Sequence, residues 1–189
     1  MPIERATAAE AAVIRAVHPE MSKSEVIDLA RRHDVAVWEG RATVSKFHAD
    51  DDPARATPYE VVGSEPNVLT TAGVTNLWNL AAAIGNPTPW SNGNAHIAVG
   101  TGEAEADDSD TALGAEDTRQ PMQDGFPSVS ANVITFQAVY STSSANIAWR
   151  ELGVVSAGSG GILLNRLSGS WGEKVNTAQW VATLTVALS

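Results

Sequence analysis

Short alternating segments separated by turn residues constrain the fold of this chain more than any other feature. VITFQAVY (133–140) and QWVATLTVAL (179–188) alternate between the two sides of an extended strand. IAWRELGVV (147–155) and GILLNRL (161–167) flank the glycine-rich turn SAGSGG, and HIAVG (96–100) is a further short apolar strand. Several strands joined by turns predict a mainly β fold, an antiparallel and jelly-roll-like β-sandwich.

The alternation also predicts which side chains share a face of each strand. In the strand over 133–140 the face-sharing residues are Ile134, Phe136, Ala138 and Tyr140. In the last strand they are Trp180, Ala182, Leu184, Val186 and Leu188. In the strand over 147–155, strict alternation predicts one face with Ile147, Trp149, Glu151 and Val155, and another with Ala148, Arg150, Leu152 and Val154.

TTAGVTNLWNLAAAIG (70–85) predicts one helix packed against these strands. Its apolar residues fall on a single helical stripe formed by Val74, Leu77, Trp78, Ala81 and Ile84. Gly85 is a natural residue just beyond the end of a helix.

The distribution of charge divides the chain near residue 58. Residues 1–66 hold eight of the twelve Lys and Arg residues and twelve of the twenty-two Asp and Glu residues. Residues 67–189 hold only four basic residues and are rich in Ser, Thr, Asn, Gly, Val and Ala. We therefore expect a small helical N-terminal region with an arm over 1–57, which serves attachment, and a β-sandwich domain over 58–189.

The N-terminal region contains two predicted helices. Thr7 can cap a helix over 8–17, which Pro19 ends. Ser22 and Glu25 have capping-box spacing ahead of VIDLARRH, and this predicts a second helix over 22–33. VAVWEG (35–40) predicts a short strand, and SKFHADDDPARATP (45–58), with two prolines, predicts an extended arm or loop.

The overall charge and the missing cysteines exclude several function classes. A net charge of −10 argues against a general affinity for nucleic acid or for anionic membranes. Without cysteine there are no disulfides, thiolate zinc sites or cysteine nucleophiles. The first residues carry Glu4 and Glu10 and no long apolar core, and no apolar run of about 18 residues exists, so we expect neither a signal peptide nor a membrane span.

Arg150 and Glu151 are the most conspicuous charges in a predicted strand. Adjacent strand residues point to opposite faces, so these two side chains are not expected to act together as a catalytic pair. We expect each to pair with a neighbouring strand, through Arg166, Lys174 or Glu173. Such a pair fixes the strand register, and this structural role is favoured over a catalytic one.

The acidic segment EAEADDSD (103–110) offers hard oxygen ligands for calcium in Asp107, Asp108 and Asp110. It lacks the acid spacing, the central glycine and the distal glutamate of an EF-hand loop, so a solvated acidic loop is the favoured interpretation. The acidic run at 50–52 is interpreted in the same way.

The remaining polar residues form no recognised catalytic pattern. The histidines at 18, 33, 48 and 96 lack the spacing of metal ligands, and His96 is interpreted as a packing residue at the start of a strand. The serines of STSSAN (141–146) lie in a turn without a nucleophile elbow, and the glycines of VGTGE (99–103) read as turn glycines. We therefore expect no catalytic, cofactor-binding or metal-binding residues.

An ordered set of segments along 58–189 resembles a family of virion proteins of tailed bacteriophages and covers about two-thirds of the chain. The segments are PYEVV (58–62), NVLTTAGVTNLWNL (67–80), NAHIAVGTG (94–102), TALGAED (111–117), FPSVSANVITFQAVY (126–140), ANIAWRELGVV (145–155), GGILLNRL (160–167) and WVATLTVALS (180–189). Residues 1–57 lie outside the resemblance.

The resemblance implies a non-catalytic β-sandwich that is displayed on the virus particle as an oligomer, with trimers common among such proteins. It provides no catalytic residues. Related domains occur in head decorations, head fibres and tail fibres. We expect a capsid decoration protein that is made in the host cytoplasm, resides on the capsid surface of the virion, and binds the major capsid protein or another virion protein.

Three other functions are also compatible with parts of the sequence. The first is a head or tail fibre that binds a host receptor or glycan, for which Trp90 in PTPWSNGN (87–94) is the candidate aromatic platform. The second is a DNA-binding regulator, because residues 22–38 resemble the first half of a helix-turn-helix, although no basic recognition helix follows. The third is a hydrolase with an acidic site from 103–110.

Overall fold

The computed structural model describes residue 25, residues 38–64 and residues 68–188. Its elements are β1 (Trp38–His48), β2 (Glu60–Ser64), β3 (Val68–Leu69), α3 (Thr71–Ala82), β4 (His96–Gly100), β5 (Glu116–Pro121), β6 (Ser128–Ser130), β7 (Val133–Tyr140), β8 (Ala148–Val155), β9 (Leu163–Glu173) and β10 (Ala178–Leu188). The predicted helix over 8–17 lies outside the described residues, as does that over 22–33 except for Glu25. No helix among the described residues has the length and apolar character that crossing a membrane requires.

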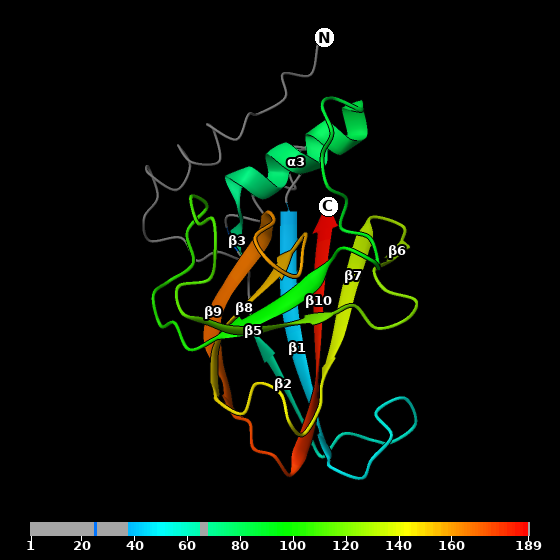
Figure 1. Cartoon of the computed structure of the whole chain (residues 1–189), viewed down its shortest axis with the longest axis vertical. Coiled ribbons are helices and arrows are strands. Elements are labelled where there is room, and N and C mark those ends of the chain that lie inside the picture. The colour runs from blue at the N-terminus through cyan, green and yellow to red at the C-terminus, as the bar shows by residue number, and fades with distance from the viewer. Residues whose placement is uncertain (1–24, 26–37, 65–67, 189) are drawn as a thin grey trace.

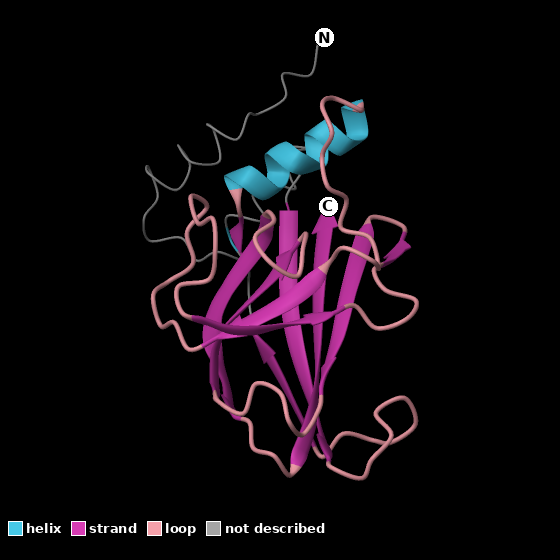
Figure 2. Cartoon of the chain, in the orientation of Figure 1, coloured by secondary structure: helices cyan, strands magenta, loops and turns pink. Residues whose placement is uncertain are grey.

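The strands form two antiparallel sheets of five strands each. One sheet has the order β2-β1-β10-β7-β6 and the other β3-β9-β8-β4-β5. Hairpins join β1 to β2, β4 to β5, β6 to β7 and β8 to β9. The two layers and the position of α3 across one end of them are visible in Figures 1 and 2. The mainly β, two-sheet sandwich expected from the sequence is therefore confirmed.

Aromatic side chains from both sheets meet in the core between the layers. Trp149 of β8 packs edge-on against Tyr140 of β7, with ring centroids 4.6 Å apart, and against Trp180 of β10 at 4.9 Å. The Tyr140 hydroxyl donates to the carbonyl of Ile97, 2.7 Å away, and so links the two sheets directly. Burial raises the pKa of Tyr140 well above its ordinary value, so this hydroxyl remains a donor. The inward residues predicted for β7 and for Trp180 to Val186 of β10 are confirmed by their burial.

β1 corrects the expected arm and the expected domain boundary. Residues 45–48 are not an arm, because they complete an eleven-residue strand that pairs along its full length with β10. Phe47 is buried, and Lys46 is buried as well because its ammonium lies 4.6 Å above the Trp180 ring and bonds to Glu60 at 3.0 Å. Within the described residues, the sandwich therefore already includes Trp38–His48, which precedes the expected boundary at residue 58.

A β-bulge in the pairing of β8 with β9 corrects the predicted faces of β8. Trp149 pairs with Gly172, whereas Glu151 pairs with Ser168, so the register shifts between them. Trp149 and Leu152 consequently both enter the main core, although strict alternation placed them on opposite faces. Glu151 points away from the main core, to the outer side of its sheet.

α3 is confirmed, but its orientation differs from the prediction. Thr70 caps the helix by accepting a hydrogen bond from the Gly73 N–H at 2.9 Å. The side facing the sandwich carries Gly73 and Asn76, which are buried, and Leu77 and Leu80, which contact the core. The predicted inward residue Trp78 is exposed instead, and the helix ends with a left-handed Ala83 rather than at Gly85.

Candidate functional site

Glu151 and Arg166 form an ion pair in which both side chains are buried. Glu151 lies on β8 and Arg166 on β9, whose direct partner is Gly153, so the two side chains are diagonal neighbours on the outer face of their sheet. Glu151 is 0% exposed and Arg166 2%. Of the partners predicted for the charges at 150 and 151, Arg166 is the one that Glu151 contacts, at 2.9 Å.

The carboxylate of Glu151 is fully used by hydrogen bonds from the loop between β4 and β5. Its Oε1 accepts from the N–H groups of Gly102 and Ala115, at 3.0 and 2.6 Å. Its Oε2 accepts from the Gly114 N–H at 2.8 Å and from Arg166 Nε at 3.0 Å. These bonds account for the lone pairs that a carboxylate offers. Glu151 therefore fastens both ends of this loop to the face of the sheet.

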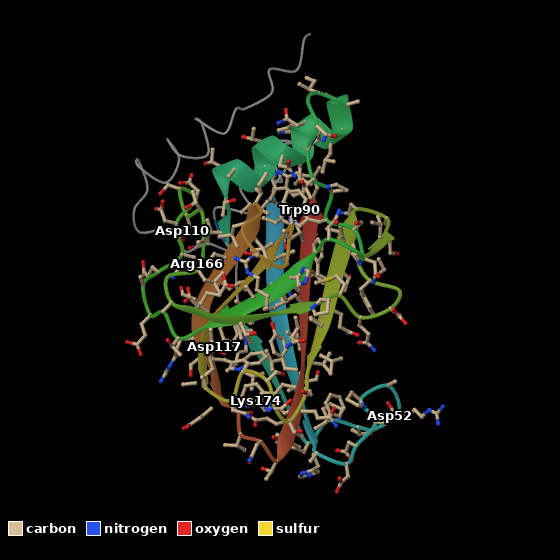
Figure 3. All side chains as sticks on the ribbon, in the orientation of Figure 1. Asp52, Trp90, Asp110, Asp117, Arg166 and Lys174 are labelled. Atoms are coloured by element: carbon tan, nitrogen blue, oxygen red, sulfur yellow. The ribbon has the colours of Figure 1, made fainter. Side chains whose placement is uncertain are left out.

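The guanidinium of Arg166 fastens the middle of the same loop. It donates to Asp110 Oδ2 at 2.8 Å and to the backbone carbonyls of Ala104 and Glu105, at 3.1 and 3.3 Å. Burial alone would lower the pKa of Arg166, but the hydrogen bonds to Asp110 and Glu151 outweigh it and raise that pKa. Arg166 and Asp110 lie together on one side of the sandwich in Figure 3.

The acidic segment 103–110 is part of this anchored loop. Asp107 accepts hydrogen bonds from the N–H and the hydroxyl of Ser109, and these bonds lower the pKa of Asp107. Asp110 accepts from the Asp107 N–H at 2.8 Å in addition to its bond with Arg166. Within 38–64 and 68–188, no group of three or more histidine or acidic side chains is arranged to hold a metal ion.

The described histidines lie far apart in the fold. His48 ends β1 and stacks on Tyr59, with ring centroids 4.7 Å apart. His96 opens β4, and its Nδ1 lies 2.9 Å from the Asn94 carbonyl. His18 and His33 lie outside the described residues.

Lys174 has a different environment from the one predicted. It is 1% exposed, and its ammonium donates to the carbonyl of Ser141 at 2.6 Å and to Asn146 Oδ1 at 2.9 Å. Both acceptors are neutral, so burial dominates and lowers the pKa of Lys174 to about 8. Lys174 thus holds the β7–β8 loop and does not pair with Glu151. Figure 3 shows its distance from Arg166 along the sandwich.

Trp90 is not available as a sugar platform in this conformation. It is 6% exposed and belongs to the main core, below α3 in Figure 3. A sugar stacks on the open face of an aromatic ring, which Trp90 does not present. Arg150, whose side chain is 41% exposed, makes only a 3.9 Å contact with Glu103 and a 3.2 Å bond to Ser170.

The arrangement around Glu151 suits anchoring and not proton transfer. A general base or nucleophile needs a free lone pair within reach of a substrate, but both oxygens of Glu151 are occupied by backbone and guanidinium donors. Polar networks that are fully bonded rigidify the structure around them. This cluster fixes the fifteen-residue connection between β4 and β5, residues 101–115, on the sheet.

Gly100, Gly102 and Gly114 are the residues of the cluster whose role the sequence did not indicate. A Cβ at Gly100 or Gly102 would collide with the carboxylate of Glu151, so both positions require glycine for the close approach of the backbone. The glycines of VGTGE are therefore close-approach glycines and not only turn residues. The two glycines that closely follow each other at the end of a predicted strand, Gly100 and Gly102, were the one sequence feature that could have indicated this close approach.

No protein-family model, curated protein or solved structure matches this chain.

Proposed function

We propose that this chain is a non-enzymatic structural protein of a tailed-phage virion, a capsid decoration protein that binds the major capsid lattice as an oligomer, most simply a trimer. One observation carries the proposal: the central charged cluster, Glu151 with Arg166 and Asp110, holds a loop against a rigid double sheet. A protein whose task is mechanical gains from such fixation. The resemblance of residues 58–189 to virion proteins supports the same assignment.

The two-sheet architecture is consistent with this role. Both sheets are antiparallel and share one aromatic core, and the long loops are tied down by Arg166 and Lys174. Exposed loops are the usual sites of proteolysis, so anchored loops favour persistence outside the cell. Edge strands are short or carry charges and proline, as in β6 and β5, which limits uncontrolled sheet-to-sheet pairing.

Quantitative mass spectrometry of purified particles of the encoding virus tests the proposal. Hundreds of copies per particle support a decoration protein, since decorations follow the symmetry of the capsid lattice. A few copies to a few dozen would indicate a fibre component instead. Absence from purified particles would contradict a virion role altogether.

A truncation tests the mode of attachment. Deletion of residues 1–37 stops immediately before β1 and leaves every described strand in place. We expect this variant to retain the β-type circular dichroism spectrum of the full chain and to lose its attachment to undecorated particles. Normal decoration by the truncated protein would show that residues 1–37 are not the attachment region.

A further inference from the structure

α3 presents a second apolar surface that the sandwich does not use. The inner side of the helix is pressed against β9, where a Cβ on Gly73 would lie 2.6 Å from the Leu164 carbonyl. About a third of a helical turn away lie Val74, Trp78, Ala81 and Ala82, followed by Ile84 just after the helix. We call these five residues the α3 surface. A helix that is apolar on two sides is typical of a helix covered on both.

The largest side chains of the α3 surface are open to solvent. Trp78 is 63% exposed and Ile84 62%. The exposed part of Trp78 alone corresponds to on the order of 150 Å² of aromatic surface. Figure 1 shows that α3 lies across the end of the sandwich, beyond the tips of the sheets. Contiguous apolar surface of this kind marks interaction sites.

The α3 surface also lies in the longest stretch of the chain that contains no Asp, Glu, Lys or Arg. That stretch runs from Pro66 to Gly102, in a chain whose net charge is −10. Copies of so acidic a protein repel one another when their charged surfaces approach. The five residues of the α3 surface carry no charge, so a contact between two such surfaces adds no charge repulsion of its own.

The chemistry of the α3 surface also selects among possible partners. A different protein that recognises an acidic chain is expected to carry basic groups and to contact the acidic loops. A second copy of this chain offers a matching surface that is equally uncharged and apolar.

We propose that the α3 surface is the self-association surface of this protein, on which Trp78 packs against a second copy of the chain. This inference rests on the proposed function, which requires an oligomer, and adds the surface that forms it. Trp78 is then the central contact, since buried tryptophans are strongly enriched among the residues that dominate interface energies.

The test compares two glutamate substitutions in the full-length chain. Trp78→Glu places a charge in the α3 surface, and Val129→Glu is the matched control, because Val129 is 72% exposed on edge strand β6. Light scattering coupled to size exclusion, across a dilution series, is expected to show oligomers for the unmodified chain and for Val129→Glu. For Trp78→Glu we expect association weakened by at least about 30-fold, with an unchanged circular dichroism spectrum.

A cross-link tests the contact directly, because the chain contains no cysteine. Ala81→Cys places one thiol in the α3 surface and is expected to give a covalent dimer on mild oxidation, whereas Ser128→Cys on β6 is not. If the unmodified chain is a monomer, the inference is wrong. The α3 surface would then be covered by another partner, either residues 1–37 of the same chain or a capsid protein. Equal association of Trp78→Glu and Val129→Glu would overturn it as well.

The outcomes separate this inference from the proposed function. An oligomer that Trp78→Glu dissociates, from a protein absent from purified particles, would support the α3 surface and refute the virion role. The opposite outcome is a protein that is found on purified particles, is a monomer in solution, and whose Trp78→Glu variant still decorates particles normally. That outcome would support the virion role and refute the α3 surface as a self-association surface.

Discussion

Replacing Glu151 by glutamine tests whether the buried pair is an anchor. The amide would put an N–H donor where one carboxylate oxygen accepts now. In one orientation this donor faces the N–H groups of Gly102 and Ala115, and in the other it faces those of Gly114 and Arg166. Neither orientation satisfies all the donors, because each oxygen has at least two.

The expected loss follows from these contacts. Each buried donor left unpaired costs about 1–3 kcal/mol, and breaking a buried ion pair by neutralising one partner costs roughly 3–5 kcal/mol. Because Asp110 still neutralises part of the Arg166 charge, the two costs are not fully additive. We expect Glu151→Gln to lower the free energy of unfolding by about 3–5 kcal/mol, a large part of the ~5–15 kcal/mol typical of a domain.

Urea denaturation measures this loss, and Arg150→Gln is the matched control. Arg150 is the adjacent residue, but its side chain is 41% exposed and its ionic contact is long, at 3.9 Å. Exposed pairs of that kind contribute less than about 1 kcal/mol. Hydrogen exchange adds a local measurement: the amides of Gly102, Gly114 and Ala115 are expected to lose protection in Glu151→Gln. A variant within 1 kcal/mol of Arg150→Gln, with unchanged exchange at these amides, would refute the anchoring role.

Three further predictions concern other structural residues. The pKa of Lys174 is about 8 in the folded chain and about 10.4 in the unfolded chain. Between these pH values the unfolded chain binds more protons, so the free energy of unfolding should rise with pH across this range. Lys174→Met should remove up to roughly 3 kcal/mol of this rise, measured by urea denaturation at a series of pH values, and parallel pH profiles of the two proteins would contradict the assignment. Gly73→Ala should lower the melting temperature by pushing α3 away from Leu164, at a cost of about 1–3 kcal/mol; an unchanged value would mean that the helix shifts freely. Thr70→Ala should cost about 1 kcal/mol in thermal unfolding through loss of the helix cap, and Thr70→Ser should restore most of it.

The strands that the sequence predicted best are those in which alternation is uninterrupted. β7 and β10 pair with each other in perfect register from Tyr140–Trp180 to Val133–Ala187. Each has one face in the core and one outside, and this arrangement is what period-two alternation reports. No bulge disturbs their pattern.

β1 was missed in part because its inward residues include a lysine. The segment Ala42, Val44 and Lys46 alternates with Thr43 and Ser45, but a lysine at an inward position and two following prolines read as a solvated arm. The aromatic face of Trp180 and the carboxylate of Glu60 make its burial possible. Both partners are distant in the sequence, so local composition does not reveal them.

The short edge strands were also invisible to pattern analysis. β2, β3, β5 and β6 contain two to six residues each, too few to establish a period. They are strands because a long neighbour supplies their hydrogen bonds, as β9 does for β3 and β7 for β6. Tertiary pairing decides such elements, and not local propensity.

The orientation of α3 shows a similar limit. The single stripe predicted from the sequence combined Leu77, which contacts the core, with Trp78 and Ile84, which are exposed. The structure places the smaller Gly73 inside because the helix backbone approaches β9 closely. Which stripe faces inward depends on how near the neighbouring strand lies, and this distance is not encoded in the periodicity.

The candidate site was predictable as a pair but not as an anchor. Glu151 and Arg166 lie on strands joined by a predicted hairpin, and Arg166 was one of the three partners expected for the charges at 150 and 151. The bulge that turns Glu151 outward and the three backbone donors that occupy it leave no side-chain signature. Only the glycines at 100, 102 and 114 indicate that a backbone comes close there.

The bulge beside Glu151 determines on which side of the sheet this charge lies. If β8 alternated strictly beyond Trp149, Glu151 would enter the aromatic core, where an ionised carboxylate is strongly disfavoured. The register shift between β8 and β9 comes where Glu151 turns to the outer face, and there the loop of residues 101–115 covers Glu151 and supplies its partners. Sheet, bulge and loop thus depend on each other: the loop buries the charge, and the charge holds the loop. Opening any of these contacts leaves a buried donor or a buried charge without one of its partners, so the cluster keeps the loop in place. The proposed structural role requires a surface that keeps its shape in this way.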